Sequence, residues 1–124
     1  STEIISVLNS IKPPYNVNEL TQQRATERLS IKGLAANEIN IILEERAALI
    51  SELNAVSFVS KIYPSDANFI LVKVDDATKR YNQLIEKGIV IRNRTTQPGC
   101  ENCLRITIGT LEENKRVLNI LKTL

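Results

Sequence analysis

The sequence predicts an α+β fold, in which three helices precede a β-β-α-β-β-α domain with a mainly antiparallel sheet. The first observation behind this prediction is the order of the apolar patterns. Helical spacing fills the first half of the chain, and the strand-like runs all follow residue 55. The second observation is the length, because 124 residues suffice for one compact domain and a short arm. We expect the helices to cover one face of the sheet.

The first segment, residues 2–11, carries apolar residues at helical spacing and is predicted to be an amphipathic helix. Pro13 and Pro14 prevent its continuation, because proline lacks the backbone N–H and restricts the residue before it. Asn18 is a favourable N-cap for a second helix, which is predicted to end near Leu29. The first helix has no obvious core of its own, which indicates that it packs against a neighbour.

The rest of the chain alternates strand-like runs with helical ones. Asp75 is expected to cap the helix between the two strand pairs, and Thr110 with Glu113 forms a capping box for the last helix. The predicted elements are a helix at 36–54, strands at 56–63 and 68–74, a helix at 76–87, strands at 89–92 and 104–108, and a final helix after Thr110. These elements assign residues 1–35 to an interdomain arm and helix, and residues 36–124 to a small domain.

The composition excludes several classes of function. The net charge is +2 and no long basic run occurs, so nucleic-acid binding is not expected. The chain has no His, which excludes Ser-His and Cys-His nucleophiles and His-ligated metal sites. The apolar runs are too short to cross a bilayer, and the first residues do not form a secretory signal. We therefore expect a cytoplasmic protein that does not bind membranes.

Cys100 and Cys103 form a Cys-x-x-Cys motif. Such a pair can be half of a zinc site or a redox motif. No second pair and no His complete a metal tetrahedron, and the motif does not open a helix after a strand, as thioredoxin-like sites do. We therefore predict no metal site, and we favour a structural interpretation of both thiols.

Arg105 is the leading candidate for a binding residue. It lies between Leu104 and Ile106, so strand alternation places the arginine on the polar face while its neighbours face the core. A guanidinium offers a planar fork of donors that suits a carboxylate or a phosphate. Arg92 ends the preceding predicted strand and would converge on the same anion if the two strands pair. From the residues alone, two solvated arginines at a strand edge are the simpler interpretation.

Two further residues are weaker candidates. Arg94 follows in the loop and is interpreted as an exposed loop charge. Tyr15 is expected to pack at a boundary between domains and is not assigned a catalytic role.

Three motifs, in this order and spacing, resemble the histidinol-phosphate aminotransferases. Residues 12–18 are similar to the segment that leaves the large domain in that family, and residues 66–70 resemble a strand signature of its small domain. The strongest match joins residues 88–92 to residues 103–110 and 112–114 across a polar interval. Together the motifs cover essentially the whole chain.

The resemblance implies a homodimeric fold-type I enzyme that uses pyridoxal phosphate. Such enzymes convert histidinol phosphate and 2-oxoglutarate to imidazole-acetol phosphate and glutamate. Arg105 and Arg92 would then bind the substrate phosphate and the carboxylate of the amino-acid partner. The family holds its cofactor in the large domain, which precedes the segment matched by residues 12–18. The chain is accordingly expected to be a C-terminal fragment of a transaminase, inactive alone and without catalytic or cofactor-binding residues.

Two alternatives come from other functional classes. The domain could be a self-standing α+β module whose two arginines bind an anionic metabolite for regulation. It could also be an interaction domain that uses the apolar first helix. The Pro-rich segment favours the aminotransferase, because a self-standing module has no use for a bridge between domains.

Overall fold

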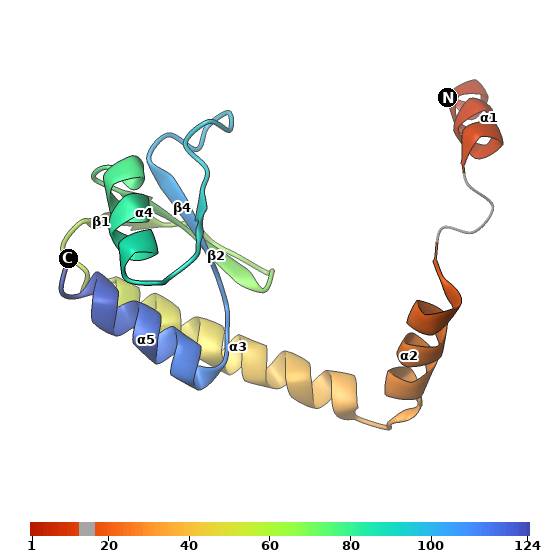
Figure 1. The fold of residues 1–124 in the computed structure, drawn as a ribbon, viewed down its shortest axis with the longest axis horizontal. Helices are drawn as coiled ribbons and strands as arrows, with labels where there is room; N and C mark the ends of the chain where they lie inside the picture. The colour runs from red at the N-terminus through yellow and green to blue at the C-terminus, as the bar shows by residue number, and fades with distance from the viewer. Residues whose placement is uncertain (13–16) are drawn as a thin grey trace. The chain divides into compact units, whose positions relative to one another are not determined.

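The computed structural model describes residues 1–12 and 17–124, which divide into two compact units, Ser1–Asn37 and Glu38–Leu124 (Figure 1). The prolines of the predicted extended segment, together with Tyr15, lie outside the described residues.

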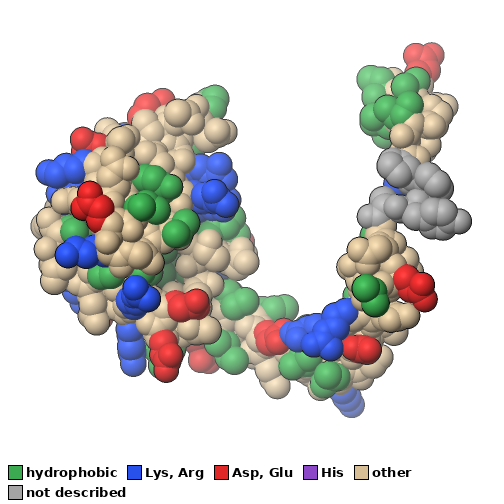
Figure 2. Space-filling model, viewed as in Figure 1, with side chains coloured by type: hydrophobic (Ala, Val, Ile, Leu, Met, Phe, Trp, Pro, Cys, Tyr) green, Lys and Arg blue, Asp and Glu red, His purple; other side chains and the backbone are tan. Residues whose placement is uncertain are grey.

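The first unit contains two helices whose starts agree with their sequence signals. In α1 (Thr2–Ile11) the Ser1 hydroxyl accepts a hydrogen bond from the Ile4 N–H. In α2 (Glu19–Ser30) the Asn18 side chain accepts from the Thr21 N–H at 2.8 Å, as its role of N-cap predicts. Neither helix buries a residue. Apolar side chains gather on the surface of α1 in Figure 2, and those 52% to 71% exposed are Ile4, Ile5, Val7, Leu8 and Ile11.

The second unit is the sheet domain. Its four strands are ordered β1-β2-β4-β3, and every pairing is antiparallel. The elements in chain order are α3 (Leu34–Leu53), β1 (Val59–Ile62), β2 (Phe69–Val74), α4 (Ala77–Glu86), β3 (Arg92–Asn93), β4 (Cys103–Thr107) and α5 (Leu111–Leu121). The predicted α+β class and the β-β-α-β-β-α order are confirmed.

The core lies between one face of the sheet and three helices. Ile70, Val72 and Val74 of β2 are buried, and they pack in one cluster with residues of α3, α4 and α5 such as Leu53 and Leu84. The alternate residues of the sheet lie on the opposite side, which these helices do not cover, and all but the buried Cys103 are half-buried or exposed. We call this side the open face; it carries Phe69, Leu71, Lys73, Arg105 and Thr107.

The predicted N-cap of α4 was wrong. The N-cap of α4 is Asp76, whose carboxylate accepts from the Lys79 N–H at 2.9 Å. Asp75 instead forms an ion pair with Arg80, at 2.7 Å, and therefore lies one residue outside the cap.

The predicted strand at 89–92 is reduced to β3. The chain leaves α4 in a tight turn, in which the Ile89 N–H donates to the Leu84 carbonyl at 2.8 Å. Ile89 and Ile91 are then buried in the core rather than held in the ladder. Of the predicted strand, only Arg92 pairs with β4. No helix among the described residues has the length and apolarity that spanning a bilayer requires.

Candidate anion-binding site

The two arginines singled out by the sequence lie directly opposite each other on neighbouring strands. Arg92 of β3 is the register partner of Arg105 of β4 in an antiparallel pair. Residues opposite one another in such a pair have Cβ atoms about 4.5–5.5 Å apart and side chains on the same side of the sheet. The strand pairing on which their convergence depends is thus present. The binding role of the two side chains stays a prediction.

Arg105 is held in place by the open face. Its guanidinium lies over the Phe69 ring, 5.1 Å from the centroid. Leu71 of β2 is its register partner on the other side of β4. The Arg105 Nε is buried and has no hydrogen-bond partner among the described residues. A buried donor left without an acceptor costs about 1–3 kcal/mol, so this atom suits a site that receives an acceptor from a ligand.

The charges of the site are uncompensated. Within residues 1–12 and 17–124, neither Arg92 nor Arg105 forms an ion pair with a carboxylate. Like charges directly opposite on a sheet destabilise it. An anion between the two guanidinium groups would replace this repulsion with charge-assisted hydrogen bonds, which are bidentate in the best geometry. The site therefore fits a phosphate or a carboxylate.

Arg94 lies two residues beyond Arg92, in the segment that follows β3. It is half-buried rather than exposed, and its backbone N–H donates to the Cys103 carbonyl at 2.8 Å. This bond continues the ladder beyond β3 and anchors the loop after Arg92.

The two cysteines close a turn beside the strand pair. The Cys103 N–H donates to the Cys100 carbonyl at 3.0 Å, and Cys103 is completely buried. Partial burial raises the pKa of the Tyr63 phenol, and the neighbouring Cys103 thiol raises it further. Tyr63 thus packs beside the thiol. The described residues contain no group of three His, Cys, Asp or Glu side chains with the spacing of a metal site.

The described residues contain no enclosed lysine of the kind that holds pyridoxal phosphate. The cofactor needs a lysine for its Schiff base. In the desolvated sites that activate a lysine, its amine is buried or closely surrounded. All eight lysines of the chain are described, and none is buried. Lys73 is half-buried on the open face, and the other seven are exposed.

One buried polar residue was missed by the sequence analysis. Asn114 of α5 is buried, donates from Nδ2 to the Glu45 carboxylate at 2.8 Å and to the Gly109 carbonyl at 3.1 Å, and accepts from the Gly109 N–H at 2.9 Å. These hydrogen bonds connect the segment after β4 to α5 and α3. The available signal was its position, because Asn114 falls on the apolar stripe of α5 with Val117 and Leu121.

Comparisons with known proteins identify the family of the chain. A family model described as aminotransferase class I and II matches residues 1–121. The chain is 68% identical to a histidinol-phosphate aminotransferase of Flavobacterium johnsoniae over all of its 124 residues, which are 36% of that relative. It is 59% identical to the histidinol-phosphate aminotransferase of Flavobacterium psychrophilum, again over the whole chain and 36% of the relative.

A solved structure shows the same fold. The crystal structure of the histidinol-phosphate aminotransferase from Clostridium acetobutylicum matches 99% of this chain and 38% of its own, with a TM-score of 0.85 and 26% identity. The chain thus spans little more than a third of the length of the relatives that it matches. Because the family model covers almost every residue, the chain belongs to the class I and II aminotransferases.

Proposed function

We propose that residues 1–124 are the C-terminal small domain of a histidinol-phosphate aminotransferase, a pyridoxal-phosphate enzyme of histidine biosynthesis. The observation that carries this proposal is the opposed, uncompensated pair Arg92–Arg105 on the open face. The names of the relatives and the three sequence motifs support the same assignment. We refer to the longer chain, of which these residues would be a part, as the parent chain.

The proposed substrates carry the anions that the arginine pair suits. Histidinol phosphate has a phosphate group, and 2-oxoglutarate and glutamate have carboxylates. Arg105, which is half-buried and backed by Phe69, orients one anion rigidly. Arg92 is exposed and completes the fork from the edge strand. Both residues bind and position substrates, and no residue of this chain is assigned a proton transfer.

The cofactor belongs to the remainder of the parent chain. Pyridoxal phosphate acts as an electron sink for the carbanion formed at the substrate carbon. Its lysine would lie in the two thirds of the relatives' length that this chain does not span. Residues 1–124 alone are accordingly proposed to be inactive, and the active form to be a cytoplasmic homodimer of parent chains.

A direct test compares the parent chain with residues 1–124 alone. The parent chain should transfer an amino group from histidinol phosphate to 2-oxoglutarate, and the short chain should show no turnover. Borohydride reduction in the presence of pyridoxal phosphate should label one lysine of the parent chain outside residues 1–124. Stoichiometric labelling of a lysine within the short chain would overturn the proposal, as would a parent chain without transaminase activity.

The regulatory module is the second candidate. One observation favours it: unit Glu38–Leu124 has a complete hydrophobic core and carries both arginines. Titration of the isolated chain with inorganic phosphate and with 2-oxoglutarate separates the two functions. Saturable micromolar binding that needs Arg105 would favour the module. The aminotransferase assignment predicts weak binding, because half of the site would be missing.

A further inference from the structure

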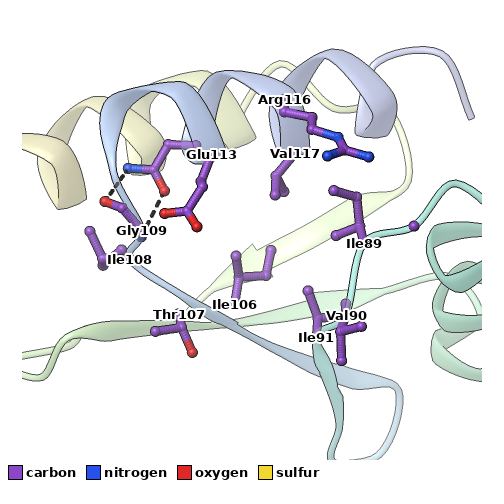
Figure 3. A pocket seen from close by; sticks show the side chains of 12 residues that line it. Ile89, Val90, Ile91, Ile106, Thr107, Ile108, Gly109, Glu113, Arg116 and Val117 are labelled. Atoms are coloured by element: carbon purple, nitrogen blue, oxygen red, sulfur yellow. Dashed lines mark hydrogen bonds between the residues drawn. The ribbon is translucent and has the colours of Figure 1, made fainter.

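A groove on the sheet domain lies beside the arginine pair and is not explained by it. Its volume is about 570 Å³, and its walls are residues 88–91, residues 106–109 and the first turns of α5. Figure 3 shows Ile89, Val90 and Ile91 on one side, Thr107 and Ile108 on the other, and α5 above. Arg92 and Arg105 do not line it. The groove is therefore distinct from the proposed anion site.

The groove opens where two chain segments stop pairing. In β4, every second residue directs its backbone groups toward β3, because Cys103 accepts from the Arg94 N–H and Arg105 is the partner of Arg92. The same alternation points the backbone of Thr107 in this direction. Continued register would pair Thr107 with Val90, yet β3 contains only residues 92 and 93. The chain diverges, so the Thr107 backbone faces the groove, which Val90 lines from the other side.

The edge of β4 at Thr107 is not paired with β3. The Ile108 N–H donates to the Asn68 carbonyl at 2.9 Å, so alternation along β4 directs the Thr107 N–H and C=O away from β2. Beyond the sheet ladder, neither group has a backbone partner among the described residues, and Val90 is 77% exposed. Gly109 limits the edge, because Asn114 binds both its N–H and its C=O (Figure 3). The floor is apolar, with Ile106, Ile89 and Val117. An unpaired strand edge beside an apolar floor accepts another extended chain, which supplies backbone hydrogen bonds and apolar side chains.

We propose that this groove, the strand slot, receives an extended, apolar segment of the parent chain from outside residues 1–124, which enters the sheet between residues 88–91 and β4. The inference rests on the proposed function, since the chain spans only 36% of a relative that it matches at 68% identity. The occupant adds a strand that hydrogen-bonds Thr107 on one side and Val90 on the other. The segment would thereby tie the remainder of the enzyme to the sheet that carries Arg92 and Arg105.

Amide hydrogen exchange tests the strand slot at one atom. In the isolated chain the Thr107 amide should exchange nearly as fast as an unstructured one. In the parent chain it should be protected at least about 100-fold more, because it then donates to the inserted strand. The Ile106 amide lies on the β2 side of the ladder and should be protected in both, so it serves as the internal control.

A matched pair of variants gives a second readout. Thr107→Pro removes an N–H that strand alternation directs into the strand slot, whereas Thr107→Val keeps that donor. In the isolated chain both variants should melt within about 2 °C of wild type. In the parent chain only Thr107→Pro should lower the melting temperature. If it prevents folding of the parent chain, the exchange measurement on wild type still decides.

Three outcomes separate the strand slot from other occupants and from the proposed function. A Thr107 amide that is unprotected in an active parent chain would exclude the strand slot and leave the aminotransferase assignment intact. Protection in the isolated chain that grows with concentration would identify a second copy as the occupant. A protected Thr107 in a parent chain without transaminase activity would support the strand slot and reject the proposed function.

Discussion

Helices α1 and α5 follow the same local rules and have opposite fates. Each is amphipathic and begins at a hydroxyl N-cap, Ser1 in one and Thr110 in the other. α5 buries Asn114 and Leu121 against the sheet domain, whereas α1 buries no residue. An apolar stripe therefore specifies which face of a helix can be buried, but burial also requires a second surface. For α1 we expect that surface in the rest of the parent chain.

The largest expected effect contrasts a core leucine with one on α1. Leu53 is completely buried, so Leu53→Ala should destabilise the isolated chain by about 2–5 kcal/mol through lost burial and a cavity. Leu8→Ala removes the same atoms from an exposed position and should change stability by less than about 0.5 kcal/mol. Urea denaturation followed by circular dichroism measures both.

The same two leucine variants test in the parent chain whether another surface covers α1. If a neighbouring domain covers α1, Leu8→Ala should become clearly destabilising there. Equal, negligible effects in both chains would show that α1 has no partner surface.

The next contrast compares two arginine ion pairs. Arg80 is buried, donates to both Asp75 carboxylate oxygens, to the Leu124 carbonyl and to Gln83, and lies 4.0 Å from the Phe58 ring centroid. Because Asp75 is 46% exposed, we expect Arg80→Ala to cost roughly 2–3 kcal/mol, less than a fully buried pair.

Arg24 and Glu27 provide the matched surface pair. Their side chains on α2 are 74% and 65% exposed, so Arg24→Ala should cost about 0.5 kcal/mol or less. Thermal melts of the two variants should separate clearly. Similar losses would mean that α2 is packed as tightly as α4.

A smaller contrast concerns the helix caps. Thr110 forms a complete capping box with Glu113, so Thr110→Ala should destabilise the sheet domain by about 1 kcal/mol. Asn18→Ala should reduce the helical content of α2 and leave the cooperative unfolding transition of the sheet domain unchanged. Circular dichroism amplitude and the urea midpoint report these two effects separately.

The Asp75–Arg80 ion pair also predicts a pH dependence of stability. The Arg80 side chain lowers the pKa of Asp75 from 3.8 to about 2. Since the folded-state pKa is depressed, the stabilisation is complete above pH 3.8 and is lost as the pH falls toward 2. Asp75→Asn should therefore be less stable at neutral pH and show a flatter acid limb. An unchanged acid limb would show that the ion pair is not maintained in solution.

Local signals in the sequence predicted most of the fold. The bounds of α1, the cap of α2 and the capping box of α5 depend on neighbouring residues, and each was predicted correctly. The cap of α4 was misassigned because two adjacent aspartates offer the same chemistry. The contact of Asp75 with Arg80, five residues further along the chain, separates them.

The site was predictable to a similar extent. Alternation along β4 placed Arg105 on the face opposite the core, and the structure adds the register that sets Arg92 across from it. That register could not be predicted, since the predicted strand at 89–92 pairs only at its end. Asn114 and the strand slot were missed because both depend on how distant segments diverge.

Substitution of Arg105 in the parent chain tests directly whether this residue binds the substrate anions. Arg105→Ala should raise the KM of both the phosphate substrate and 2-oxoglutarate, or at least of one of them. Loss of a charge-assisted contact costs about 1.5–3 kcal/mol, which is about one to two decades in apparent affinity. Arg105→Lys should recover only part of the loss, because an ammonium cannot reproduce the fork of donors. Melting temperatures should stay near wild type in both variants. Wild-type kinetics for both substrates in Arg105→Ala would contradict the account, and an unfolded Arg105→Ala would assign the residue to the stability of the sheet.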